Sequence, residues 1–224
     1  MQRKAVLVGR ARETMTDEEE AETTQASLVW AEWDARRAQR PGFIEALMRD
    51  AMAFAGHRGE HVGLDSRQSR WRYAVGLLWR SDTYLGLVLY RIRTALHDRA
   101  IPILPKLIHI FCTAVFGLSI GERVVLKAGI YVPHGRIVLD GIVLIGSGCY
   151  LAPWTLIGLV HGNFLGPKIG DKVFVGVRSK ILGDVTIGDG ARIGASAVVL
   201  SDVPAGATAV GVPAKIHTKE ANGG

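Results

Sequence analysis

Cysteine, long apolar runs and blocks of like charge are all scarce in this chain of 224 residues. Its two cysteines, Cys112 and Cys149, are too few for a disulfide framework and offer no metal-ligand spacing. The most apolar run, residues 107–118, contains His109 and is too short to span a bilayer. We therefore expect no disulfide, no metal site and no integral membrane segment.

The charge of the chain is positive but dispersed. Net charge is +6, yet no run of five or more basic residues occurs, so we do not expect nucleic-acid binding. A mild positive field suits a small polyanionic ligand instead. The first residues lack the apolar core of a secretion signal, and we expect a cytoplasmic protein.

A six-residue repeat runs through the second half of the chain. Aliphatic residues recur at intervals of six residues, and we call this set of residues the comb. The residue after each of them is usually glycine or alanine. Self-similarity at a short fixed period is typical of a solenoid, and this period is typical of a parallel β-helix built from hexapeptide turns. The comb consists of Ile145, Leu151, Ile157, Ile169, Val175, Ile181, Ile187, Ile193 and Val199.

Six residues provide one short strand and one corner, because side chains alternate between the two faces of a strand. The aliphatic residue points inward, and the small residue beside it permits a sharp bend. Three such sides close a triangular coil of roughly 18 residues, and stacked coils bury a continuous apolar core. The sequence therefore predicts a mainly β protein organised as a parallel β-helix.

The comb has two faults. Between Val132 and Leu139 it slips by one residue, and His134 lies inside this slip. Through residues 159–168 the phase is lost, and it returns at Ile169. The second fault predicts either a loop that projects from the coil or one poorly formed coil. Functional residues tend to gather where a regular solenoid becomes irregular.

Helical periodicity precedes the β-helix. We expect helices over residues 43–56, over 71–98 with a new start near Thr83, and over 106–116, where Gly117 ends the last one. The predicted organisation is a poorly ordered polar segment (1–40), an α-helical domain (41–117), a β-helix domain (118–217) and a flexible tail (218–224).

Three segments, together with the coils, resemble a known family. Residues 89–92 (LYRI), 116–120 (FGLSI) and 211–215 (GVPAK) are similar to those of the serine O-acetyltransferases, within the hexapeptide-repeat acyltransferases. The resemblance covers about residues 82–217. It implies a left-handed β-helix, acetyl-CoA as cosubstrate without a metal, and a homotrimer with sites between subunits. It also implies that a hexamer can form through the helical domain.

Acetyl transfer from a thioester to a hydroxyl needs a general base, and histidine is suited to this near neutral pH. Only His134 and His161 lie within the predicted coils. His134 sits at the slip, and residues 132–138 match the catalytic histidine segment of the family. We therefore expect His134 to be the base, Asp140 or Glu122 to orient it, and His161 to be a second catalytic histidine.

This chain departs from the family at four positions. The family has an aspartate fifteen residues before the catalytic histidine and another directly before it. It also has an arginine that holds the serine carboxylate and a histidine before a Pro-Lys pair. The corresponding residues here are Ser119, Pro133, Leu165 and Gly166.

The resemblance also indicates where CoA and the acceptor bind. Small residues let the pantetheine arm approach the backbone, and fixed cations suit the phosphates. Arg136 suits an acceptor carboxylate, and Asn163 and Phe164 suit the wall of the site. The expected cofactor-binding residues are Gly176, Val177, Arg178, Ser179, Lys180, Gly194, Ala195 and Lys215.

Three functions remain open at this point. The first is an O-acetyltransferase that acts on serine or a similar small hydroxy compound. The second is a sugar O- or N-acetyltransferase in polysaccharide or cell-surface biosynthesis. The third is a trimeric scaffold without catalysis. A metal-dependent β-helix enzyme would need three converging histidines, which the coils do not offer.

Overall fold

The computed structural model describes residues 17–218, with side chains from residue 24 onward. The chain divides into two compact units, residues 1–38 and 39–224, and each is described by itself. Helix α2 (Asp17–Arg37) is the described part of the first unit, within the segment expected to be poorly ordered. Residues 1–16 and all but the first residue of the expected tail 218–224 lie outside the described residues.

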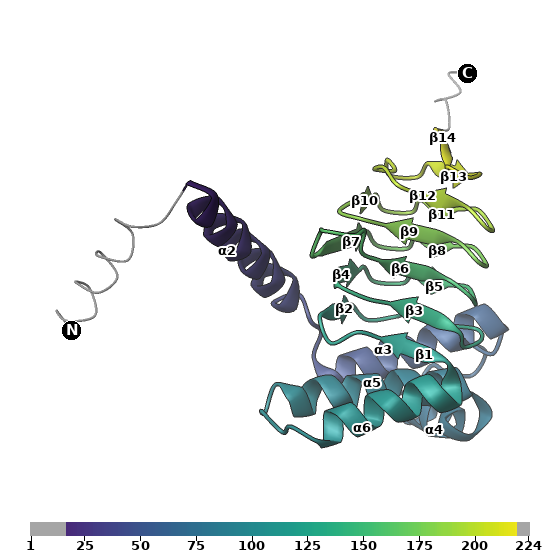
Figure 1. Ribbon diagram of the computed structural model, residues 1–224. Coiled ribbons are helices and arrows are strands. Elements are labelled where there is room, and N and C mark those ends of the chain that lie inside the picture. The colour runs from purple at the N-terminus through teal and green to yellow at the C-terminus, as the bar shows by residue number, and fades with distance from the viewer. Residues whose placement is uncertain (1–16, 219–224) are drawn as a thin grey trace. The chain divides into compact units, whose positions relative to one another are not determined.

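The second unit contains a parallel β-helix whose strands stack into three sheets (Figure 1). Sheet 1 contains β1 (Leu118–Ile120), β3 (Ile137–Leu139), β6 (Leu156–Gly158), β9 (Lys180–Leu182) and β12 (Val198–Val199). Sheet 2 contains β2 (Val124–Leu126), β4 (Ile142–Ile145), β7 (Leu165–Ile169) and β10 (Thr186–Ile187). Sheet 3 contains β5 (Tyr150–Leu151), β8 (Phe174–Val175), β11 (Arg192–Ile193), β13 (Thr208–Val210) and the antiparallel β14 (Lys215–His217).

Residues of the comb stack on one another from coil to coil. Leu139 pairs with Ile157, 18 positions later, and Ile181 pairs with Val199 at the same interval. All nine residues of the comb are buried. The predicted parallel β-helix and its inward residues are therefore confirmed.

Both predicted faults are also present. Ile120 pairs with Leu139 after 19 positions, which is the one-residue slip around His134. Ile157 pairs with Ile181 after 24 positions, because residues 159–164 form a loop between β6 and β7. The second fault is thus a loop, followed by a one-residue shift in the pairing of β7 with β4.

Four α-helices and a π-helical turn lie at the end of the β-helix that carries β1 (Figure 1). The predicted helices are confirmed, with somewhat different ends. Ser81 caps α5 through a hydrogen bond that its hydroxyl accepts from the Tyr84 amide, and Gly117 ends η1 in the left-handed conformation. The elements are α3 (Phe43–Arg58), α4 (Arg67–Arg80), α5 (Asp82–His97), α6 (Leu104–Phe111) and η1 (Cys112–Phe116).

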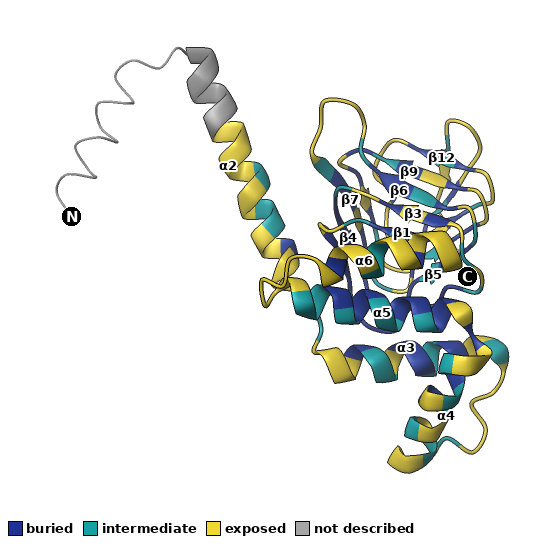
Figure 2. Cartoon of the chain, turned by 60° about the horizontal axis from the view of Figure 1, so that its bottom comes forward, coloured by how far each residue is buried: buried dark blue, intermediate teal, exposed yellow. Residues whose placement is uncertain are grey.

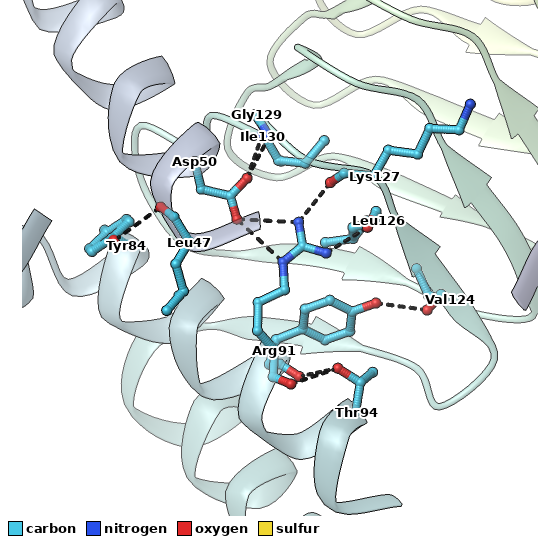
Figure 3. A network of polar contacts seen from close by, with 11 residues as sticks. Leu47, Asp50, Tyr84, Arg91, Thr94, Val124, Leu126, Lys127, Gly129 and Ile130 are labelled. Carbon is cyan, nitrogen blue, oxygen red and sulfur yellow. Dashed lines mark hydrogen bonds and ion pairs between the residues drawn. The ribbon is translucent and has the colours of Figure 1, made fainter. Parts of the chain in front are cut away.

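Helix α5 satisfies backbone groups of the first coil, which has no preceding coil to pair with. The Arg91 guanidinium donates to the carbonyl oxygens of Leu126 (2.5 Å) and Lys127 (2.6 Å) (Figure 3). The Tyr90 hydroxyl donates to the carbonyl of Val124 at 2.8 Å. An unpaired buried carbonyl would cost roughly 1–3 kcal/mol, so these bonds hold the helices on the coil.

Asp50 of α3 completes this network. One carboxylate oxygen accepts the amides of Gly129 (2.7 Å) and Ile130 (2.9 Å), and the other accepts two N–H groups of Arg91 (Figure 3). Burial raises the pKa of Asp50, whereas Arg91 and the two amides oppose that rise. Asp50 and Arg91 thus form a fully hydrogen-bonded ion pair in a buried place.

We expect Asp50→Ala to lower the free energy of unfolding by about 3–5 kcal/mol, because it leaves the Arg91 charge buried without its partner. Chemical denaturation measures this. Arg49→Ala breaks only an exposed pair with Glu45 and should cost less than about 1 kcal/mol. Equal effects of the two variants would contradict the assigned role of Asp50.

Candidate active site

The corner from sheet 3 to sheet 1, here called the 3–1 edge, collects many of the expected site residues. It comprises residues 132–136, 152–155, 176–179 and 194–197, one segment per coil. A fifth segment, residues 211–214, connects β13 to β14 within sheet 3 and continues the edge because it forms hydrogen bonds with the backbone of Val198. His134 and Arg136 lie on the first segment, and both are exposed. The expected cofactor residues lie on the third, fourth and fifth segments or directly beside them.

Backbone conformation distinguishes the 3–1 edge from the other two. Each of its first four segments holds one left-handed residue that is not glycine, whereas the other corners use glycine, with Lys172 as the exception. Residues other than glycine are strained in this conformation, and such strain gathers at functional sites. The four residues are Arg136 (φ 68°), Trp154 (φ 64°), Arg178 (φ 61°) and Ser196 (φ 59°).

These four residues form a column held by hydrogen bonds between coils. The Trp154 amide donates to the Arg136 carbonyl at 2.7 Å, and the Ser196 amide donates to the Val177 carbonyl at 2.8 Å. The Arg136 guanidinium also lies over the Trp154 ring, 4.9 Å from its centre. The backbone therefore presents a row of side chains outward beside His134.

Gly135 explains why the chain bends sharply after His134. A Cβ atom at this position would lie 1.7 Å from the carbonyl oxygen of Phe116, so only glycine fits. Within the described part of the chain, the His134 side chain forms no hydrogen bond or ion pair. Its exposed imidazole is therefore not engaged by any of the described residues of the same chain.

Most of the expected cofactor residues face solvent at this edge. Val177, Arg178, Ala195 and Lys215 are exposed, and Lys180 projects from the outer face of sheet 1. Gly176 and Gly194 directly follow Val175 and Ile193, two inward residues of the comb. Ser179 differs, because it is buried and its hydroxyl donates to the Gly176 carbonyl at 2.8 Å. Ser179 thus shapes the corner instead of offering its hydroxyl to a ligand.

The remaining expected site residues lie on a different corner, from sheet 1 to sheet 2, here called the 1–2 edge. His161, Asn163 and Phe164 are exposed on the loop 159–164. Asp140 directly follows β3, whereas His134 precedes it. The two residues lie at opposite ends of one strand and share no contact within the described part of a single chain. Glu122 is instead within 3.0 Å of His97.

A cavity of about 490 Å³ opens at the 1–2 edge, between the first two coils and helices α5 and α6. This size is typical of a small-molecule site. Neither this cavity nor the exposed Trp154 was predicted from the sequence. The charged and titratable residues that line the cavity include Arg93, His97, Lys106, His109, Glu122 and Asp140.

His109 is neutral in this cavity. The Arg93 guanidinium lies 2.7 Å from Nδ1 of His109, and since a guanidinium only donates, Nδ1 accepts and the proton sits on Nε2. Desolvation by burial lowers the pKa of His109, and Arg93 lowers it further, whereas Asp140 opposes this effect. His109 therefore presents an N–H donor at Nε2.

The four residues that depart from the family pattern lie at three different places in the β-helix. Ser119 of β1 pairs with Val138, and Pro133 lies on the 3–1 edge beside His134. Leu165 and Gly166 begin β7, where the pairing with β4 shifts by one residue. None of these four residues offers a charge for an acceptor.

Family models match two parts of the chain. Residues 166–201 match the bacterial transferase hexapeptide model, and residues 112–133 match the hexapeptide repeat of succinyl-transferase. The serine acetyltransferase of Helicobacter pylori strain J99 is 36% identical over 139 residues, which are 60% of this chain and 81% of the relative. The chain belongs to the serine acetyltransferase family.

Solved structures agree with this assignment. The serine acetyltransferase of Neisseria gonorrhoeae, in complex with serine, is 29% identical with a TM-score of 0.66, over 77% of this chain and 68% of that one. A serine acetyltransferase in complex with CoA is 27% identical with a TM-score of 0.66, over 82% and 73% of the two chains. The fold of this serine acetyltransferase family member is the left-handed parallel β-helix expected from the sequence. It is an acyltransferase of the acetyl-CoA-dependent class.

Other features of this family member bear on its chemistry. Among residues 24–218, no three or more His, Cys, Asp or Glu side chains gather to hold a metal ion. Both cysteines are free and buried, and burial raises the pKa of Cys149 to about 12. In the described part of the chain, no helix has the length and apolar character to cross a membrane.

We expect His109 to make stability depend on pH. The folded protein holds this proton less tightly than the unfolded chain, whose histidine pKa is about 6.5, so stability falls as pH drops below about 6.5. Melting temperatures of the wild type and of His109→Gln are measured at about pH 7.5 and about pH 5.5. The drop between the two pH values should be larger for the wild type. The glutamine keeps an acceptor for Arg93 but does not titrate. Parallel pH profiles would contradict the neutral state of His109.

Proposed function

We propose that this protein transfers acetyl from acetyl-CoA to a hydroxyl group, with His134 as the general base. The 3–1 edge carries this proposal, because it aligns an unengaged histidine with the cofactor residues on consecutive coils. His134 Nε2 or Nδ1 takes the proton of the acceptor hydroxyl as its oxygen attacks the thioester carbonyl. The tetrahedral intermediate then collapses, the acetyl–oxygen bond remains, and CoA leaves as a thiol after protonation.

The cofactor runs along the 3–1 edge in this proposal. A Cβ atom on Gly176 would lie 2.7 Å from the amide nitrogen of Ala195, so the corner stays narrow and the backbone accessible to the pantetheine arm. Arg178 and Lys215 supply positive charge for the phosphates. The solved relative in complex with CoA supports the same cosubstrate.

Serine is the leading acceptor. Relatives named serine acetyltransferase and a solved one in complex with serine support it. A sugar hydroxyl or amine is the second candidate, and Trp154 favours it. The Trp154 side chain is 53% exposed on the edge that holds His134, and aromatic rings stack on the apolar faces of sugar rings.

We further propose that the site is completed by a second copy of the chain. The expected site residues lie on two edges that flank sheet 1, so one copy does not bring them together. In a ring of copies joined through sheet 1, the 3–1 edge of one copy meets the 1–2 edge of the next, because such contacts join unlike patches. His134 of one chain then faces Asp140 and the 159–164 loop of its neighbour.

Exposed apolar side chains support this association. Helix α6 is largely exposed (Figure 2) although it is apolar around most of its circumference, with Leu104, Leu107, Ile110 and Phe111 open to solvent. Val138 is exposed on the outer face of sheet 1. Large exposed apolar patches mark contact surfaces, and a homotrimer is the ring that we propose.

We expect His134→Ala to lower turnover by about 10²–10⁴-fold, because the hydroxyl then loses its base. Thiol release from acetyl-CoA, with serine, homoserine and a panel of sugars, measures both the activity and the acceptor. His61→Ala, at an exposed histidine in the α3–α4 loop, is the matched control and should keep full activity. Unchanged turnover in His134→Ala would remove the proposed base, and no thiol release with any acceptor would favour a scaffold.

We expect two inactive variants to restore activity to each other. One is His134→Ala, and the other combines Asp140→Asn with His161→Ala. Equal, randomly mixed copies should regain about one quarter of the wild-type sites, because a site needs both intact halves from neighbouring chains. Refolding the mixture and following thiol release measures this. Recovery of no activity, with both variants assembled, would place the whole site on one chain.

A further inference from the structure

The cavity at the 1–2 edge holds uncommitted charges of both signs. The Lys106 ammonium and the Asp140 carboxylate both line it, and neither forms a hydrogen bond or ion pair within the described residues. Glu122 and His97 also line the cavity, and they contact each other at 3.0 Å. Among the described residues that line the cavity, Lys106 and Asp140 are thus charged groups without a partner, and Arg93 has no acidic partner.

Hydrogen-bond donors also line the cavity. Arg93 is only 7% exposed, and its described bonds to His109 and to the Gly121 carbonyl engage two of its five N–H groups. His109 presents its Nε2–H, because Nδ1 accepts from Arg93. Together with Lys106, these groups form a cradle for a carboxylate.

We infer that this cavity binds the acceptor as a zwitterionic α-amino acid. Its carboxylate lies among Arg93, His109 and Lys106, and its ammonium pairs with Asp140. Serine has both charges and a reactive hydroxyl. The inference rests on the proposed function and adds the residues that hold the acceptor.

The location of the cavity fits this role. At the family positions that would hold serine, this chain has Pro133, Leu165 and Gly166, which carry no charge, so another set of residues must bind the two charged groups. The cavity lies on the same edge as Asp140 and the 159–164 loop. In the proposed ring, that edge meets the 3–1 edge of a neighbour with its His134.

Ligands that lack one charge test the two halves of the cavity separately. The full-length protein is titrated with L-serine and with two analogues: serinamide lacks the carboxylate, and 3-hydroxypropionate lacks the ammonium. Ligand-observed NMR measures the affinity for each ligand. We expect Lys106→Ala to weaken serine and 3-hydroxypropionate about tenfold but to leave serinamide unchanged. Asp140→Asn should weaken serine and serinamide by about the same factor and leave 3-hydroxypropionate unchanged.

Turnover gives a second readout. Both variants should raise the KM for serine and leave the KM for acetyl-CoA unchanged, since the cofactor lies on the other edge. Lys172→Ala and Asp65→Asn change exposed residues of the same types elsewhere and should change neither constant. Circular dichroism checks that every variant is folded.

The outcomes separate this inference from the proposed function. Serine affinity that is unchanged in both variants, or reduced equally for all three ligands, overturns the inference. If serine is still acetylated with an unchanged KM, the proposed reaction stands and the acceptor binds elsewhere. If no acceptor releases thiol from the wild type, the proposed reaction fails, and only charge-selective binding of serine would keep the cavity as an amino-acid site.

Discussion

Hydrogen bonds from one helix to the unpaired backbone of the first coil support the structure of residues 39–218. A solenoid leaves a row of carbonyl and amide groups without partners at its first coil, and burying them unsatisfied would be costly. Helix α5 supplies donors at successive turns through Thr83, Tyr90, Arg91 and Arg93, and Asp50 accepts the amides that remain. Because Arg93 also lines the cavity, the groups that close the end of the β-helix also form part of the wall of the cavity.

In our proposal, the chemistry of this protein is divided between two corners of the triangular β-helix. The 3–1 edge holds His134 and the expected cofactor residues beside a column of left-handed backbone positions. The 1–2 edge holds the projecting loop and the cavity with charges of both signs. The outer face of sheet 1, which exposes Val138 and Lys180, lies between these edges. Within residues 24–218 of one chain, His134 has no hydrogen-bond or ion-pair partner, and for this reason association and catalysis are coupled in our proposal.

The six-residue comb was sufficient to predict the coils, their inward residues, the slip at His134 and the break after Ile157, because each follows from a local period. The same period separates two of the expected site residues. Asp140 follows His134 by six residues, which is one side of the triangle, so one chain does not bring the two together. The cavity could not be predicted in this way, since it depends on how α5 and α6 dock on the first coil. Trp154 had a visible signal, because it is a large aromatic residue at a corner where the other coils carry small or polar residues.

The loop 159–164 has six residues, the length of one side of a coil, and the register of β7 with β4 is restored by Ile169. Because the loop lies outside the stacked strands, a change in its sequence leaves the inward residues of the coils in place. The loop can therefore vary while the core of the β-helix stays the same, and in our proposal such variation would change the wall of the acceptor site. For protein engineering, this position is the natural place to graft a different recognition loop.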